Sequence, residues 1–165
     1  MCYVNVETNN LLAGRYLGWL TYEEYVDWAV GCLESGLDSK NIRILASLRK
    51  PLYSSEVENY FNRSLHDLGW HLPDRKECLM EYARGSAREI VTGTISPLDG
   101  CRKIYRVVVS LQYPKELMPW VYLDEGLEPD TYSDLSGAAW DTAIVKEAER
   151  FMSKGSGVDL EDSFL

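Results

Sequence analysis

The chain has 165 residues, 45% of them hydrophobic and 26% charged, with a formal net charge of −9 at neutral pH and an isoelectric point near 4.7. A chain of this length can bury about 68–70% of the surface that its unfolded form exposes, so it needs no metal or disulfide to fold. Nucleic acids and anionic membranes bind basic surfaces, and the charge therefore argues against both as partners. It favours a basic protein as the partner, although acidity also serves plain solubility.

The cysteines and the N-terminus indicate the compartment. The four cysteines are widely spaced, form no C-x-x-C pair and fall mostly on apolar stripes of predicted helices, as small core residues of a reducing compartment do. The first ten residues lack the basic start and apolar stretch of a signal peptide, and no apolar run approaches about 18 residues. We therefore expect a cytoplasmic protein without a cofactor or a membrane-spanning helix.

Residues 1–18 carry the least regular pattern of the ordered part. Residues 3–6 are compatible with an extended segment, and residues 11–17 with a short helix that ends at Gly18.

The clearest pattern is a helical hairpin over residues 19–49. Thr21 and Glu24 have the spacing of a capping box, which begins a helix, and Gly36 supplies the left-handed residue that ends one. A cap at residues 38–39 begins the second helix. Apolar residues occupy most of the circumference of this second helix, so we expect other helices to pack on more than one side of it.

Two more helices follow the hairpin. Ser55 and Glu58 repeat the capping-box spacing, which predicts a helix over residues 55–68. Leu72-Pro73-Asp74 then begins a fourth helix that runs to Gly93. Gly85 interrupts this helix and suggests a bend or a close contact with another helix.

The next segment carries conflicting signals. Ser96 followed by Pro97 is a strong helix start, whereas the β-branched triplet at residues 107–109 and the alternation of residues 105–113 favour a strand. We predict a helix because of the cap and the helical surroundings.

Three prolines divide residues 114–135 into short helical turns joined by loops. Ser136 is expected to cap a last helix with one apolar face, formed by Trp140, Ile144, Ala148, Phe151 and Met152. The fold class is therefore all-α. We expect a single domain over residues 1–153, with about six or seven helices packed as successive helical hairpins, followed by a flexible acidic tail over residues 154–165.

No local signature of catalysis is present. Nucleophile-base patterns and phosphate-binding glycine loops are missing, and the two histidines do not have the spacing of a metal-binding helix. We therefore predict no catalytic or metal-binding residue. Two alternatives to a binding protein stay open: an enzyme that uses Glu77, Glu81 or His66 with a metal between helices, and a structural subunit of a larger complex.

One segment stands out by its charge. Between Lys115 and Lys146 there is no Lys or Arg, whereas acidic and aromatic residues alternate. Loops of this kind on a rigid scaffold often bind partners, and charge of one sign steers an oppositely charged partner. The plain alternative is an acidic loop whose aromatic residues hold it to the core. The predicted partner-binding residues are Trp120, Tyr122, Asp124, Glu125, Glu128, Asp130, Tyr132 and Asp134.

Basic residues gather elsewhere, on the fourth and fifth predicted helices, and part of this set is expected to pair with the acidic segment. The set comprises Arg84, Arg88, Arg102, Lys103 and Arg106.

Three runs of sequence resemble a known group of proteins. YEEYVDWAVGCLESGLDSKNIRILASL, ISPLDGCRKIYRVV and AAWDTAIVKEAERF are similar to a group of small uncharacterised bacterial helical proteins, some of which resemble immunity proteins encoded next to secreted or contact-delivered toxins. The resemblance implies a helical fold and carries over no catalytic residue. It makes an immunity-type inhibitor of a basic toxin, such as a nuclease, the most specific functional expectation.

Overall fold

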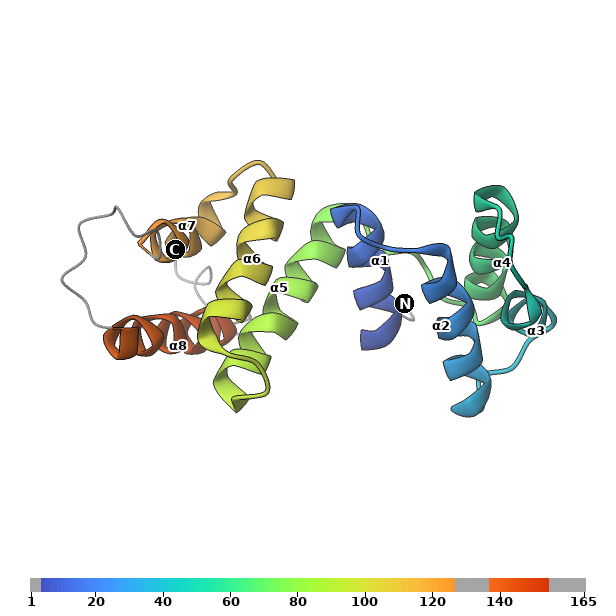
Figure 1. Cartoon of the computed structure of the whole chain (residues 1–165), viewed down its shortest axis with the longest axis horizontal. Coiled ribbons are helices and arrows are strands. Elements are labelled where there is room, and N and C mark those ends of the chain that lie inside the picture. The colour runs from blue at the N-terminus through green and yellow to red at the C-terminus, as the bar shows by residue number, and fades with distance from the viewer. Residues whose placement is uncertain (1–3, 127–136, 155–165) are drawn as a thin grey trace, which may run out of the picture. The chain divides into compact units, whose positions relative to one another are not determined.

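The computed structural model describes residues 4–126 and 137–154, which form eight α-helices and one short 3₁₀ helix, with no strand among them (Figure 1). The all-α class is confirmed. The expected count of six or seven helices is too low, because residues 118–125 form a helix where the sequence suggested only short turns joined by loops. Most of the tail that we predicted lies outside the described residues.

The chain divides into two compact units, residues 1–78 and 79–165. We describe each unit separately, and the single domain over residues 1–153 stays a prediction.

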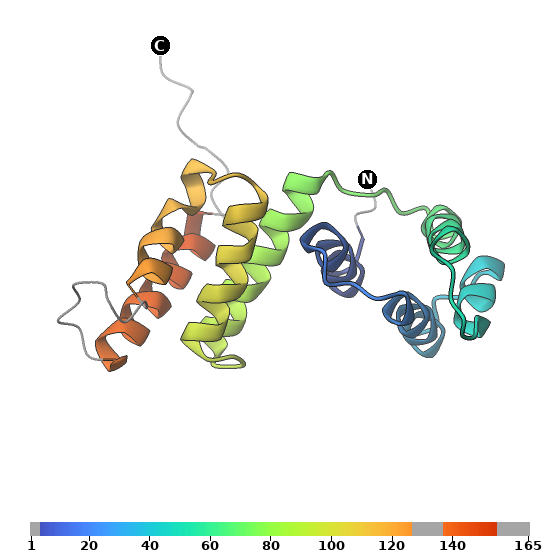
Figure 2. The ribbon, with the colours of Figure 1, turned by 45° about the horizontal axis from the view of Figure 1, so that its top comes forward.

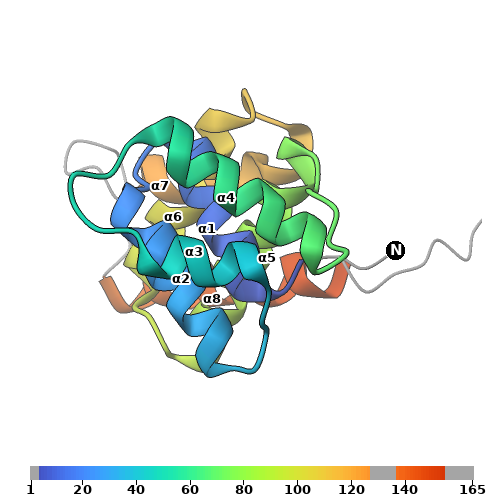
Figure 3. The ribbon, with the colours of Figure 1, turned by 90° about the vertical axis from the view of Figure 1, so that its right-hand side faces the viewer.

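Unit 1 contains the first four helices, and α3 contacts both α2 and α4 (Figure 3). The predicted covering of α3 on more than one side is therefore confirmed. Beneath it, the Phe61 ring meets Tyr25 and Trp28 edge to face, with ring centroids 5.0 and 4.9 Å away. The helices are α1 (Val6–Leu17), α2 (Tyr22–Glu34), α3 (Lys40–Ser47) and α4 (Ser54–Asp67).

The helix starts in unit 1 agree with the sequence in two of four cases. The Glu24 carboxylate accepts a hydrogen bond from the Thr21 N–H at 2.6 Å, and Ser39 caps α3. However, α1 begins earlier than expected, because the Asn5 side chain caps it. The second capping box is wrong: α4 begins at Ser54, and its cap residue Tyr53 provides no side-chain hydrogen bond.

Five helices end with the same backbone motif, in which a residue with positive φ allows the chain to fold back over the last turn. After α2, for example, the Leu37 N–H donates to the Cys32 carbonyl at 2.8 Å. Four of these positions are glycines, as the motif favours. They are Gly18, Gly36, Gly69 and Gly93, and Gln112 takes this place after α6.

Most of α5 belongs to unit 2, where it lies beside α6 (Figures 1 and 2), while α7 contacts α6 and α8 contacts both α6 and α7. The helix in the disputed segment is confirmed, because Val107 and Val108 are fully buried whereas Val109 is 46% exposed, as on one face of a helix. The elements are α5 (Arg75–Thr92), α6 (Pro97–Ser110), the 3₁₀ helix Lys115–Leu117, α7 (Met118–Glu125) and α8 (Gly137–Lys154).

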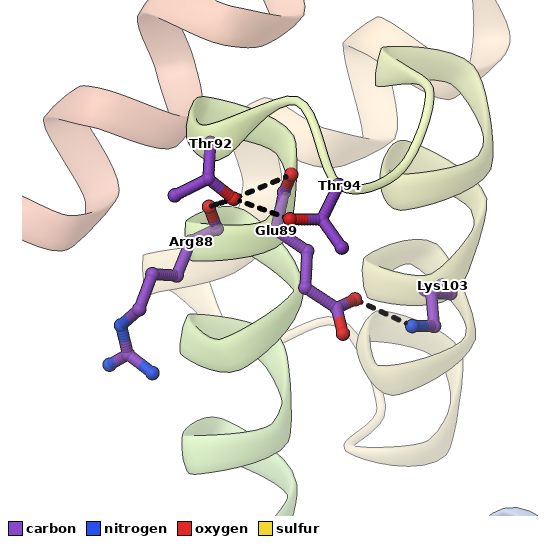
Figure 4. A network of polar contacts seen from close by, with 5 residues as sticks. All are labelled: Arg88, Glu89, Thr92, Thr94 and Lys103. Atoms are coloured by element: carbon purple, nitrogen blue, oxygen red, sulfur yellow. Dashed lines mark hydrogen bonds and ion pairs between the residues drawn. The ribbon is translucent and has the colours of Figure 1, made fainter.

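An ion pair joins α5 to α6, and hydrogen bonds of Thr92 close the last turn of α5 (Figure 4). The Lys103 ammonium lies 2.7 Å from the Glu89 carboxylate, and the Thr92 hydroxyl donates to the Arg88 carbonyl at 3.0 Å and contacts the Thr94 hydroxyl.

The close contact that we expected at Gly85 is absent from the described residues, since a Cβ there would meet no atom within 4 Å.

The core face of α8 follows the prediction in part: Trp140 and Met152 are half-buried, and the predicted cap Ser136 lies outside the described residues. Ile144, Ala148 and Phe151 are buried on one face of α8. The cysteines in the described ranges are buried and free, and burial raises their pKa to about 11 for Cys32 and to about 12 for the other two. They are therefore unreactive core residues. Those cysteines are Cys32, Cys78 and Cys101.

Candidate functional site

The structure describes half of the predicted partner-binding residues, and it corrects one of them. Trp120 is fully buried in α7, where its ring meets Phe151 edge to face at 6.1 Å. It is therefore a core residue and not a partner anchor. Tyr122 is 65% exposed on the same helix, and Glu125 is exposed near its end. The other predicted residues, Glu128, Asp130, Tyr132 and Asp134, lie outside the described residues.

The part of the acidic segment before Gly126 is a helix and not a loop. Leu117, Trp120 and Val121 are buried and hold α7 against its neighbours. Tyr122 lines a shallow groove of about 430 Å³ between α7 and α8, whose other wall includes Lys146 and Arg150. Arg150 pairs with Glu147 in the same wall, so this groove carries charges of both signs.

The basic residues of α5 and α6 have partners close by. The Arg84 and Arg88 guanidinium groups lie 3.4 and 4.0 Å from Glu81, and Lys103 pairs with Glu89. In the part of the chain that the structure describes, these three cations therefore form ion pairs with acids of α5, and not with the predicted acidic segment.

A second surface, in unit 1, is the better candidate. A groove of about 590 Å³ lies between α1, the turn that follows it, and α2. Carboxylates from both helices border it, and its floor contains aromatic and aliphatic side chains. The carboxylates are those of Glu7, Glu24, Asp27 and Glu34, and the apolar residues are Leu11, Trp19, Leu20 and Trp28.

Both tryptophans of this floor are held in place. The Trp19 N–H donates to the Gly14 carbonyl at 3.1 Å, and the indole packs so closely on Gly14 that a Cβ there would lie 2.7 Å from the ring. The Trp28 indole N–H donates to the Thr8 hydroxyl at 2.9 Å inside the core. Trp28 is buried, whereas Trp19 is 41% exposed at the groove and is available to a ligand.

The groove is strongly negative. Arg15 is the only basic residue between positions 4 and 38, and it pairs with Glu58 of α4 at 3.4 Å. Within the described ranges, no ion pair joins Asp27 or Glu34 to a cation. The charge of Glu7 adds to burial in raising the pKa of the Cys32 thiol. The groove therefore offers unpaired carboxylates beside an exposed indole.

Sequence reasoning missed this groove because it treated the acidic residues of α2 as an ordinary solvated helix face. Two signals were available. The first 38 residues contain one basic residue, and Gly31 lies inside a helix where no turn requires it. Neither signal shows that α1 packs beside α2, so the shape of the groove needed the structure.

The side chains proposed for an alternative metal-dependent enzyme do not form a cluster in the described ranges. In residues 4–126 and 137–154, no three His, Cys, Asp or Glu side chains converge as a metal site would require. His66 and His71 are exposed and far from the groove residues in sequence. Among the helices that the structure describes, none has the length and apolarity that crossing a membrane requires.

Comparison with known proteins gives no further assignment: no protein family, curated protein or solved structure matches this chain.

Proposed function

We propose that the chain is a non-enzymatic protein-binding module whose partner is a basic protein. The observation that carries this proposal is the groove of unit 1, where the unpaired carboxylates of Asp27 and Glu34 flank an exposed Trp19. Tryptophan is a frequent energetic anchor of protein interfaces, and carboxylates of one sign speed the approach of a basic partner.

The specific form of this function that we propose is an immunity-type inhibitor, which covers the basic surface of a toxin such as a nuclease. The acidic composition and the family resemblance support it. The groove provides the main contact. Tyr122, Asp124 and Glu125 of α7, together with Glu128, Asp130, Tyr132 and Asp134, provide a second one.

The test is affinity capture from the lysate of the source cells, with charge-neutralised variants as comparison. The groove variant is Asp27→Asn/Glu34→Gln, and the control Glu56→Gln/Glu149→Gln removes the same charge from exposed positions elsewhere. A single basic protein that the wild type and the control retain and the groove variant loses would support the proposal.

The captured protein is then purified and its Kd measured at several salt concentrations. We expect the groove variant to bind about tenfold more weakly than the control at low salt. Its Kd should also depend less on salt concentration, because the charges that salt screens in the wild type have been removed. Capture of no basic protein, or equal loss by groove variant and control, would contradict the proposal. A parallel Asp124→Asn/Glu125→Gln variant measures the contribution of α7.

A further inference from the structure

Resting on the proposed function, we infer that the groove between α1 and α2 receives a basic amphipathic helix of the partner, which lies along α2 with its closest approach over Gly31. The groove thus recognises a shape as well as a charge. Carboxylates, the exposed indole and the missing side chain of Gly31 each contribute to this inference.

The carboxylates form a row along α2. Glu24, Asp27 and Glu34 line the same groove, and Gly31 lies between the last two. At a rise of about 1.5 Å per residue the row is about 15 Å long. A partner helix that lies along α2 has the same rise per residue. Its side chains at positions i, i+3 and i+10 therefore lie opposite Glu24, Asp27 and Glu34. In an extended chain the side chains on one face recur every ~6.8 Å, and this spacing does not match that of the carboxylates.

Gly31 gives the partner room to approach. It lies inside α2 and lines the groove, and a Cβ at this position would meet no atom of this chain within 4 Å. A glycine inside a helix costs about 1 kcal/mol relative to alanine. Nothing in the packing of unit 1 requires a glycine at position 31. A partner helix in the groove, however, could bring its backbone closest to α2 at this position, because no side chain of α2 separates the two helices there.

Trp19 supplies the apolar end of the site. It is held on Gly14 and still 41% exposed, so its indole face is free to stack on an arginine side chain or an apolar residue of the partner helix. The charged row and the indole together match an amphipathic helix better than a single small cation.

The experiment uses two peptides and two variants of the full chain. The first peptide is an alanine-rich helix of about 18 residues with arginines at i, i+3, i+7 and i+10, and the second has the same composition with the arginines spread around the helix. Binding to the wild type, to Gly31→Leu and to the matched control Gly85→Leu is measured by fluorescence anisotropy. Gly85 is also inside a helix and also has open space around its Cβ.

We expect the wild type and Gly85→Leu to bind the one-faced peptide about tenfold more tightly than its isomer, and Gly31→Leu to lose about tenfold in affinity without any change of charge. Thermal unfolding of Gly31→Leu should occur at or above the wild-type temperature, because leucine favours a helix over glycine. If Gly31→Leu unfolds earlier, Asp27→Lys/Glu34→Lys replaces it and should abolish binding of the one-faced peptide.

Equal binding of the two peptides, no binding of either, or unchanged affinity of Gly31→Leu would overturn the inference. These outcomes differ from a failure of the proposed function. If the captured basic protein depends on Asp27 and Glu34 but tolerates Gly31→Leu, the function stands and the seated helix is wrong. Without any basic partner for the wild type, both proposals fall.

Discussion

The contact between Gly100 of α6 and Ile90 of α5 allows a quantitative test of the packing in unit 2. A Cβ on Gly100 would lie 2.2 Å from Cγ1 and 2.6 Å from Cδ1 of Ile90, and 3.0 Å from Cδ1 of Ile95. Ile90 is only 3% exposed and has little free space to move into. We therefore predict that Gly100→Ala destabilises the protein, although alanine is the better helix former.

The expected magnitude follows from two opposing effects. Alanine gains about 1 kcal/mol over glycine inside a helix, whereas overpacking a core costs about 1–3 kcal/mol. Because the nearest overlap involves Cγ1 and not only the terminal methyl group, we expect a cost at the upper end of this range and a net loss of about 1–2 kcal/mol. Ile90→Ala alone should cost about 2–5 kcal/mol, since it leaves a cavity.

The double variant distinguishes the clash from other effects. In the Ile90→Ala background the two closest atoms are gone, and the remaining neighbour, Cδ1 of Ile95, is a terminal methyl group that can move into the vacated space, so Gly100→Ala should change sign and stabilise the protein by up to about 1 kcal/mol. Urea unfolding followed by circular dichroism measures the free energy of unfolding of all four proteins. A Gly100→Ala substitution that is equally destabilising in both backgrounds, or stabilising in the wild type, would refute the close packing of α5 on α6.

Three further predictions concern stability and reactivity. Gly85→Ala should raise the free energy of unfolding by about 0.5–1 kcal/mol in urea, because the helix gains propensity and the Cβ meets no neighbour; a loss would show that this position is packed. Gln112→Gly should also stabilise, by up to about 1 kcal/mol, because its φ of 59° is left-handed, and Gln112→Ala serves as the control. In a Cys2→Ser variant at pH 8, alkylation should proceed only on unfolding, since burial excludes the reagent and raises the thiol pKa values further above the working pH; rapid alkylation of the native protein would contradict this. The thiols concerned are Cys32, Cys78 and Cys101.

Helix ends were predictable where a few neighbouring residues determine them. The bond between Thr21 and Glu24 and the left-handed conformation of Gly36 depend on contacts within one turn, and the sequence states both. The same local logic resolved the conflict in α6, where the cap Ser96 outweighed the β-branched triplet.

Where tertiary contacts decide, sequence reasoning was less successful. The buried face of α1 includes Thr8 and Asn9, which look polar and hide the helical pattern. Their partners lie far away in the chain: Thr8 accepts from Trp28, and the Asn9 side chain donates to the Cys78 carbonyl at 3.1 Å. Only the folded unit satisfies these groups, so the sequence pattern could not show that α1 begins at Val6.

The acidic segment was misjudged for a related reason. Its prolines and acidic residues suggested a loop, but Pro119 lies in the first turn of α7, where proline is tolerated. Trp120 and Val121 are buried on one face of α7, but the helix contains fewer residues than the stretch of sequence that is needed to recognise helical periodicity.

The glycines inside helices separate what folding requires from what it does not. Gly100 and Gly14 have packing reasons, since Ile90 and Trp19 occupy the space that a Cβ would need. At Gly31 and at Gly85 the space is open, and each helix loses about 1 kcal/mol of propensity without any gain in packing. Natural proteins tolerate costs of this size both at functional sites and elsewhere, so the cost alone does not mark a site. What distinguishes Gly31 from Gly85 is its location in an acidic groove, between the unpaired carboxylates of Asp27 and Glu34, and a docking surface for a basic helix would explain this location.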